Sequence, residues 1–249
     1  CNGTVAPPIV ISSPSVGTTF NWTNSNPAIG VPAAGAGDIA GFMPVNPGIG
    51  TISSTVTVTP SLLGCVGPNS TFTINVKPSP VIPTPASLVI CPNIGSPATA
   101  LISVPAGASY NWTNDNAAIG LATAGVGNVP FFLAKNTTTA NISGNITITP
   151  TLAGCAGTTV NYSVTVKPNP IVMGTANQVY CTGDNVPASN FTSVPPGATF
   201  TWTNGYTQFI GLGPSGAGNT PAFVAANPAI FPVNGNLAIT ATLNGCAGP

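Results

Sequence analysis

The sequence has almost no charge. Its 249 residues include three lysines and three aspartates but no Glu, Arg or His. Charged residues make up 2% of the chain, against roughly 25% in ordinary globular proteins. Without a basic patch, nothing attracts nucleic acid or an anionic membrane surface electrostatically. No apolar run is long enough to span a membrane as a helix. We therefore expect no nucleic-acid partner and no membrane insertion.

The missing residue types also exclude most enzyme chemistry. General acid–base catalysis needs a His or a tuned carboxylate, and a Ser or Thr nucleophile needs a base to activate it. Asp38 is replaced by Asn128 and Asn219 at matching positions, which indicates a turn residue. Calcium needs clustered oxygen ligands, and zinc bound by the cysteines would need further ligands. We expect no catalytic, cofactor-binding or metal-ligating residue, and no cofactor.

The sequence instead repeats itself about every 90 residues. One aromatic stretch occurs three times, and each copy holds one of the three tryptophans. The copies are Thr19–Asn24 with Trp22, Ser109–Asn114 with Trp112, and Thr199–Asn204 with Trp202. Residues two apart in a strand share a face, so an aromatic and a Trp share one face while Asn or Thr line the other. This alternation predicts a half-buried strand with Trp in the core.

The residues around each tryptophan predict further strands and no helix. Segments 55–59 and 72–76 alternate apolar and polar residues, which is typical of a hairpin with one buried face. The Gly/Ala-rich segment 33–38 indicates a tight turn rather than a phosphate-binding loop, because no Lys or helical stretch follows it. The third repeat has one extra residue just before Phe209, as expected for a loop.

These patterns give an all-β fold. About seven short strands per repeat, separated by turns, fit an immunoglobulin-like sandwich. We predict a tandem array of three such domains, at 1–80, 81–170 and 171–249. Proline-rich segments at 77–80 and 167–170 predict short, stiff connections. The third repeat lacks a counterpart of the last strand at 158–167, so we expect that the native chain continues or that a neighbouring molecule adds a strand.

Six cysteines, two per repeat, suggest disulfides and an oxidising compartment. In immunoglobulin-like topology, the first strand starts at the same end as the loop that joins the last two strands. The first cysteine of each repeat begins the first strand, and the second lies in that loop. The predicted pairs are Cys1–Cys65, Cys91–Cys155 and Cys181–Cys246. Buried free thiols are one alternative, and a lipidated Cys1, as in mature bacterial lipoproteins, is another.

Several motifs recur together. They are an initial Cys, aromatic-Asn-Trp-Thr-Asn, Ala-Ile-Gly-Leu, Gly-x-Gly-Asp/Asn, Ile-Thr-Ile-Thr-Pro, Gly-Cys-x-Gly and Val-Lys-Pro-x-Pro. This combination resembles the PKD-like repeats of very large cell-surface and secreted proteins of Bacteroidetes, including gliding-motility adhesins. The resemblance covers all three repeats and implies an extracellular array of immunoglobulin-like domains without catalytic residues. The usual PKD motif Trp-Asp-Phe-Gly-Asp-Gly is absent, so this is the divergent type.

We interpret the sequence as a non-enzymatic, extracellular structural and adhesive segment of a large bacterial surface adhesin or filament, of the gliding-motility type. Its expected partners are neighbouring repeats of the same chain and copies of itself. A carbohydrate-binding array that recognises surface polysaccharide is the second hypothesis, although the tryptophans lie on core strands. A self-assembling extracellular fibre is the third, because nearly uncharged surfaces do not repel one another. Nine Asn-x-Ser/Thr sequons, Asn21 and Asn111 among them, mark glycosylation in a eukaryotic protein and arise by chance in a bacterial one.

Overall fold

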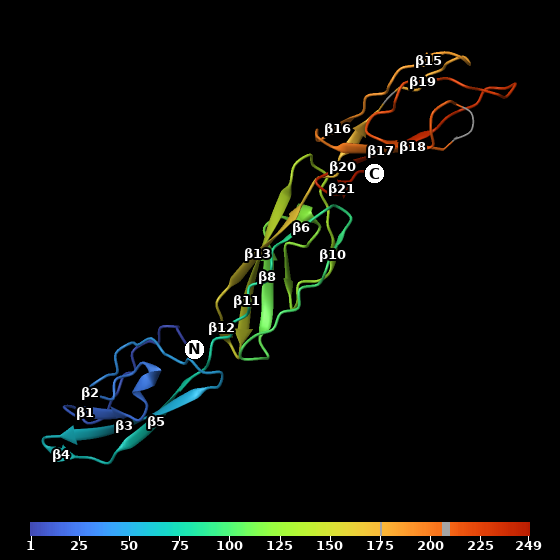
Figure 1. Ribbon diagram of the computed structural model, residues 1–249. Coiled ribbons are helices and arrows are strands. Elements are labelled where there is room, and N and C mark those ends of the chain that lie inside the picture. The colour runs from blue at the N-terminus through green and yellow to red at the C-terminus, as the bar shows by residue number, and fades with distance from the viewer. Residues whose placement is uncertain (175, 206–209) are drawn as a thin grey trace.

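The chain forms an elongated rod of β-sandwich units arranged end to end (Figure 1). The computed structural model describes residues 1–174, 176–205 and 210–249. Within these ranges the regular structure is strand, apart from two three-residue 3-10 helices that the sequence did not indicate. The protein is thus an all-β tandem array of immunoglobulin-like sandwiches, as predicted. The extra residue of the third repeat, just before Phe209, lies outside the described ranges.

The first repeat is built around its longest strand, β3. Its elements are β1 (Thr19–Asn24), η1 (Pro27–Ile29), β2 (Ala34–Ala36), β3 (Ile52–Leu62), β4 (Cys65–Val66) and β5 (Ser70–Val76). β1 pairs with one edge of β3, β4 and β5 pair with the other, and β2 extends the sheet beyond β1. The opposing layer is thin and is held by the bridges Ala6–Phe42 and Ile9–Ile39. Prolines along these segments remove backbone donors, which keeps the layer short of full strands.

The second repeat has the same sheet with one strand more. Its elements are β6 (Leu88–Ile90), β7 (Gly95–Ser96), β8 (Ser109–Asn114), η2 (Ala117–Ile119), β9 (Ala124–Val126), β10 (Phe132–Leu133), β11 (Ile142–Leu152), β12 (Cys155–Ala156) and β13 (Val160–Val166). The order is β6-β13-β11-β8-β9, with β12 also on β11. The added strand β6 runs parallel to β13, and β7 pairs with β10 in the opposing layer.

The third repeat keeps the tryptophan strand and its partners. Its elements are β14 (Ile171–Met173), β15 (Asn185–Val186), β16 (Thr192–Val194), β17 (Thr199–Asn204), β18 (Ser215–Ala217), β19 (Phe223–Val224), β20 (Leu237–Leu243) and β21 (Cys246–Ala247). The sheet order is β18-β17-β20-β21, while β14 pairs with β16 and β15 with β19. In the described part of this repeat, no strand pairs with β20 in the way that β5 pairs with β3 and β13 with β11.

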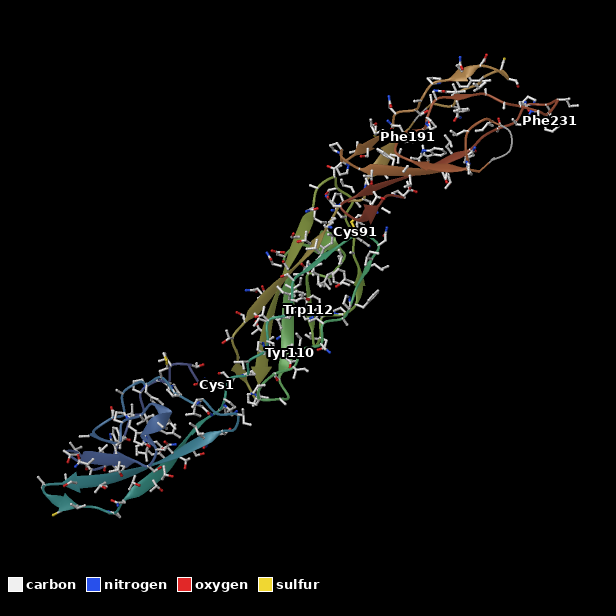
Figure 2. The ribbon with its side chains drawn as sticks, in the orientation of Figure 1. Cys1, Cys91, Tyr110, Trp112, Phe191 and Phe231 are labelled. Carbon is white, nitrogen blue, oxygen red and sulfur yellow. A yellow bond between two sulfur atoms is a disulfide. The ribbon has the colours of Figure 1, made fainter. Side chains whose placement is uncertain are left out.

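Each repeat has its own hydrophobic core, and one tryptophan belongs to each core. Trp22, Trp112 and Trp202 are 5%, 4% and 4% exposed. Figure 2 shows Trp112 in the middle of the second unit, close to Tyr110. No indole nitrogen of the three has a hydrogen-bond partner among the described atoms. The tryptophans therefore stabilise the cores through apolar burial alone, which contributes roughly 25 cal/mol for each Å² removed from water.

A glycine faces each tryptophan ring. Gly35 lies on β2 directly opposite Trp22, and the same pairing recurs at Gly125 and Gly216. A Cβ at any of the three would overlap the indole. Segment 33–38 is therefore not only the tight turn that the sequence predicts. It is a short edge strand whose missing side chain makes room for the ring, followed by a turn at Gly37 with φ 68°.

Replacing Gly35 with Ala should destabilise the first repeat. The added methyl group must displace the buried indole, and overpacking of this kind costs about 1–3 kcal/mol. Gly50→Ala is the matched control in the same repeat, because a Cβ there meets no atom and surface changes usually stay within about 0.5 kcal/mol. In denaturant unfolding followed by tryptophan fluorescence, the transition of the first repeat should move to a lower denaturant concentration for Gly35→Ala only. Equal midpoints for the two variants would contradict the packing described.

Candidate functional site: the joints between repeats

The structure pairs cysteines between repeats and not within them. Cys1 bonds to Cys155, and Cys91 bonds to Cys246. Cys65 and Cys181 are free and exposed. The predicted pairs Cys1–Cys65, Cys91–Cys155 and Cys181–Cys246 are therefore wrong. Figure 2 shows Cys1 and Cys91 at the two places where one unit meets the next.

The prediction misplaced the first cysteine relative to the first strand. β6 runs parallel to the last strand of its repeat, β13, so both strands end at the same pole of the unit. The backbone N–H of Lys167 donates to the carbonyl of Ile90 at 2.9 Å, just beyond both strands. Cys91 follows Ile90 directly. The first cysteine therefore marks the end of the first strand and lies at the pole where the repeat ends. The apolar run at 88–90 was the sequence signal for this strand.

The second cysteine lies at the opposite pole. Cys65 and Cys155 follow hairpin turns at the far ends of β3 and β11. Each of these strands has 11 residues, which span about 33 Å. A disulfide needs Cα atoms roughly 4.4–6.8 Å apart, so it cannot join the two poles of one repeat. End-to-end stacking instead brings the first cysteine of one repeat to the second cysteine of the next, at Cα–Cα distances of 5.4 and 5.5 Å.

Two lysines add a second connection across each joint. The ammonium of Lys77 donates to the carbonyl of Ala153 at 3.0 Å, and that of Lys167 donates to the carbonyl of Asn244 at 2.7 Å. Both acceptors lie in the hairpin turn that precedes the second cysteine, with φ of 49° and 50°. Non-glycine residues rarely adopt this conformation. Both lysines lie in the connections predicted at 77–80 and 167–170, but the sequence did not predict that their ammonium groups cross the joint. Their matching positions in a nearly uncharged chain were a signal.

The repeats also approach closely at the level of the backbone. Gly157 lies against the carbonyl of Pro80, and Gly248 lies against that of Pro170. A Cβ at either glycine would overlap the carbonyl group. The two ends of the Gly-Cys-x-Gly motif thus have separate roles. The first glycine follows the strained turn residue, and the last leaves room for the linker of the preceding repeat.

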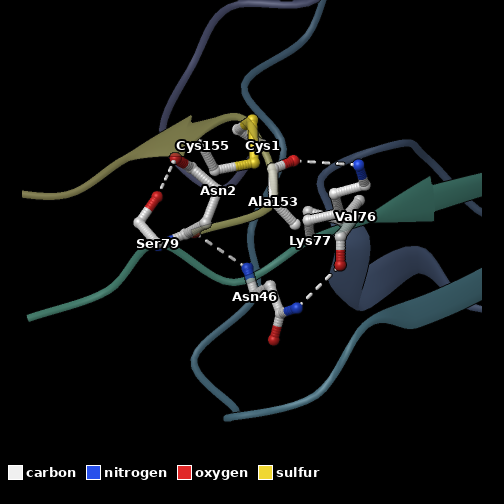
Figure 3. Close-up of a disulfide and its surroundings, with 8 residues drawn as sticks. All are labelled: Cys1, Asn2, Asn46, Val76, Lys77, Ser79, Ala153 and Cys155. Atoms are coloured by element: carbon white, nitrogen blue, oxygen red, sulfur yellow. Dashed lines mark hydrogen bonds between the residues drawn. A yellow bond between two sulfur atoms is a disulfide. The ribbon is translucent and has the colours of Figure 1, made fainter. Parts of the chain in front are cut away.

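Polar side chains fix the pole that presents the first cysteine (Figure 3). The Asn46 side-chain amide donates to the carbonyl of Val76 at 2.7 Å, and the Asn46 backbone N–H donates to Asn2 Oδ1 at 2.9 Å. The Ser79 hydroxyl donates to the carbonyl of Asn2 at 3.0 Å. Asn136 repeats the contact with the last strand in the second repeat, at 2.8 Å. The residue after Cys1 is therefore tied both to the end of β5 and to the linker.

The side chains of the three aspartates accept hydrogen bonds from the backbone. Each accepts a backbone N–H: Ile11 N to Asp38 Oδ1 at 2.8 Å, Asn145 N to Asp115 Oδ1 at 2.7 Å, and Cys181 N to Asp184 Oδ2 at 2.7 Å. Asn128 replaces Asp38 in the second repeat and accepts the equivalent bond at 2.9 Å, so this position requires an acceptor and not a charge. Within the described ranges, no three His, Cys, Asp or Glu side chains gather as a metal-binding group would. The same ranges contain no helix that could cross a membrane.

Two further features of the fold are a buried tyrosine and an open groove. Burial raises the pKa of the Tyr162 phenol, and its hydrogen bond with Thr99 at 3.3 Å acts in the opposite direction. Tyr162 belongs to the core of the second repeat. An open groove of about 570 Å³ runs beside Trp22, Asp38 and Phe42. Because Trp22 is 5% exposed, the groove does not present its ring face for stacking on a ligand.

We expect a thiol reagent to modify two cysteines in each native chain. Cys65 and Cys181 are exposed and free, whereas the other four cysteines are in disulfides. Iodoacetamide without reductant should therefore label only these two, and all six should react after reduction in denaturant. Non-reducing peptide mapping should link Cys1 to Cys155. A bond between two cysteines of one repeat would contradict the arrangement of the poles.

Comparison with known proteins finds solved structures of low similarity to this chain. No family model matches the chain, and no curated protein matches it. A protocadherin gammaB7 EC3-6 cis-dimer structure is 13% identical at a TM-score of 0.36, over 91% of this chain and 63% of that one. Mouse cadherin-23 EC22-24 is 12% identical at a TM-score of 0.36, over 96% and 86%. Sidekick-1 immunoglobulin domains 1-4 are 12% identical at a TM-score of 0.32, over 99% and 69%. These similarities are too low to identify a family or a function.

Proposed function

We propose that this chain is a non-enzymatic, extracellular structural segment of an adhesive array, with domains at 1–80, 81–170 and 171–249. Its function is to hold more distal parts of a surface protein away from the cell under load. The more specific assignment, a repeat of the gliding-motility adhesin type in Bacteroidetes, rests on the sequence motifs. Disulfides persist in oxidising compartments such as the cell exterior, which supports the location.

The observation that carries this proposal is the overlap of the two disulfides. One closes residues 1–155 and the other closes residues 91–246, so both loops contain the segment from Cys91 to Cys155. A force applied to the two ends passes from Cys1 to Cys155, back along the chain to Cys91, and then to Cys246. Only 155 minus 91, or 64, residues and the three after Cys246 can extend along this path. The disulfides therefore limit how far the array can lengthen even when every sandwich unfolds.

The joints also resist bending. Each has a covalent linker with two prolines, a disulfide and a lysine hydrogen bond. Proline restricts the backbone of the linker, and the two additional connections prevent a pivot about it. A stiff rod of limited extension suits a spacer, whereas a flexible string would collapse toward the surface. Polysaccharide binding receives less support, because the three tryptophans are buried and cannot stack on a sugar.

Single-molecule stretching tests the load path. The oxidised chain pulled from its ends should reach a contour length of about 230 Å, from about 67 residues at roughly 3.5 Å each. The reduced chain should reach about 870 Å, because about 248 residues then extend. Cys91→Ser removes one disulfide and leaves the path from Cys155 to residue 249, about 94 residues or about 330 Å.

A graded series of three lengths is the outcome expected. Cys65→Ser is the control, since Cys65 is in no disulfide and its loss should leave the oxidised length unchanged. Oxidised and reduced chains of equal length would overturn the load path and the mechanical function proposed from it. A change caused by Cys65→Ser would show that the cysteines pair in another way.

A further inference from the structure

The two free cysteines lie at opposite ends of the rod. Cys65 opens β4, which lies at one end of the molecule, and Cys181 precedes β15, which lies near the other (Figure 1). We propose that Cys65 of one copy of this chain forms a disulfide with Cys181 of another, so that copies join head to tail. This rests on the proposed function and extends it, because the same type of joint would then continue from chain to chain.

The turn that carries Cys181 has the geometry of the turns that carry the two bonded first cysteines. The Cys181 carbonyl accepts the N–H of Asp184 at 3.1 Å, and the Cys91 carbonyl accepts the N–H of Ile94 at 3.3 Å. The residue two after each cysteine also donates to the opposing segment. These bonds are Gly3 N to Pro44 O at 2.8 Å, Asn93 N to Ala134 O at 2.8 Å and Gly183 N to Ala225 O at 2.8 Å. Cys181 is therefore presented in the conformation that forms a disulfide twice elsewhere in this molecule.

The hairpin that carries Cys65 matches those of the two bonded second cysteines. Leu62 pairs with Cys65 across a two-residue turn, as Leu152 pairs with Cys155 and Leu243 with Cys246. The turn residues have positive φ in all three hairpins. The values are 52° and 85° at Leu63 and Gly64, 49° and 85° at Ala153 and Gly154, and 50° and 83° at Asn244 and Gly245. This strained turn is thus already formed where no neighbouring repeat covers it.

Exposure distinguishes the free hairpin from the bonded ones. Cys155 and Cys246 are 0% and 1% exposed beneath the preceding repeat, whereas Cys65 is exposed and Leu63 beside it is 98% exposed. The three atoms nearest a Cβ at Gly67 all belong to Pro60 of the same repeat, whereas a Cβ at its counterpart Gly157 would overlap the Pro80 carbonyl. The pole around Cys65 is therefore an uncovered copy of a surface that the structure twice shows covered by the first-cysteine pole of a similar repeat.

A second copy of this chain supplies the complementary pole. Cys181 and its turn form that pole, and they are exposed. The chain has a formal net charge of zero and three residues of each sign, so two copies approach without charge repulsion.

The bond requires a disulfide oxidant. One thiolate attacks oxidised glutathione, which gives a mixed disulfide and releases one glutathione thiolate. The second protein thiolate then attacks the protein sulfur of the mixed disulfide and releases the other. In total, two protein thiols and one oxidised glutathione give one protein disulfide and two reduced glutathiones. Both thiols are exposed, so neither step needs the sandwiches to open.

A mixing experiment with two complementary variants tests the pairing. Cys65→Ser keeps only Cys181 free, and Cys181→Ser keeps only Cys65 free. Each variant alone, incubated with oxidised glutathione, should remain a 24.5 kDa monomer on a non-reducing gel. An equimolar mixture should give a disulfide-linked dimer of about 49 kDa, twice 24.5 kDa, and nothing larger. The unmodified chain should form a ladder of multimers that reductant dissolves.

Thermolysin peptides of the mixed dimer should contain Cys65 linked to Cys181. Dimers from either variant alone would show pairing of like ends and would overturn the proposal, as would a mixture that stays monomeric. Native circular dichroism of both variants provides the folding control, because each replaces a free, exposed thiol. The stretching series uses Cys91→Ser and keeps its outcome whether or not copies join, so failure of this inference and failure of the proposed function are distinguishable.

Discussion

The cysteines of each repeat lie at opposite poles, and the order of the array depends on that separation. In the first two repeats an 11-residue central strand spans about 33 Å between the poles, so neither cysteine can reach the other while the sandwich is folded. Any partner of these cysteines must then belong to another repeat, and two repeats meet in the same way at both joints. The lysine bonds and the close Gly–Pro approaches share this geometry, because they come from the same two poles.

Because the chain has few charges, different interactions stabilise the repeats and the joints between them. Within a repeat, cohesion comes from an apolar core around one tryptophan, with hydrogen bonds from Asn, Ser and Thr at the margins. Aspartates act as backbone acceptors that asparagine can replace, as Asn128 does for Asp38. Two of the three lysines cross the joints. Exposed ion pairs would contribute little here, with a usual range of about 0–1 kcal/mol. Covalent bonds between repeats do not weaken with salt as surface charges do.

Local sequence patterns were sufficient to predict the strands. The cysteine pairing was predicted wrongly, because it depends on contacts between residues far apart in the sequence. Alternation in β3, β11 and the tryptophan strands depends only on neighbouring residues, and the structure has these strands. The pairing depends on which end of the first strand the cysteine occupies. That in turn depends on the parallel contact of β6, a strand of three residues. The sequence did not indicate that Gly35 lies opposite Trp22, because cross-strand register brings it there and register is set by the fold as a whole.

The position of the disulfides decides what unfolds and what stays joined. A disulfide within each sandwich would stabilise that sandwich against unfolding, and the linkers would then be the only connections between repeats. Bonds across the joints fix the linkers and leave each sandwich to its own core. In the chain-entropy model, closing a loop of about 154 residues stabilises by about 5 kcal/mol, and here two such loops share residues 91–155. The middle repeat is therefore held by a disulfide at both poles, and each outer repeat by a disulfide at one.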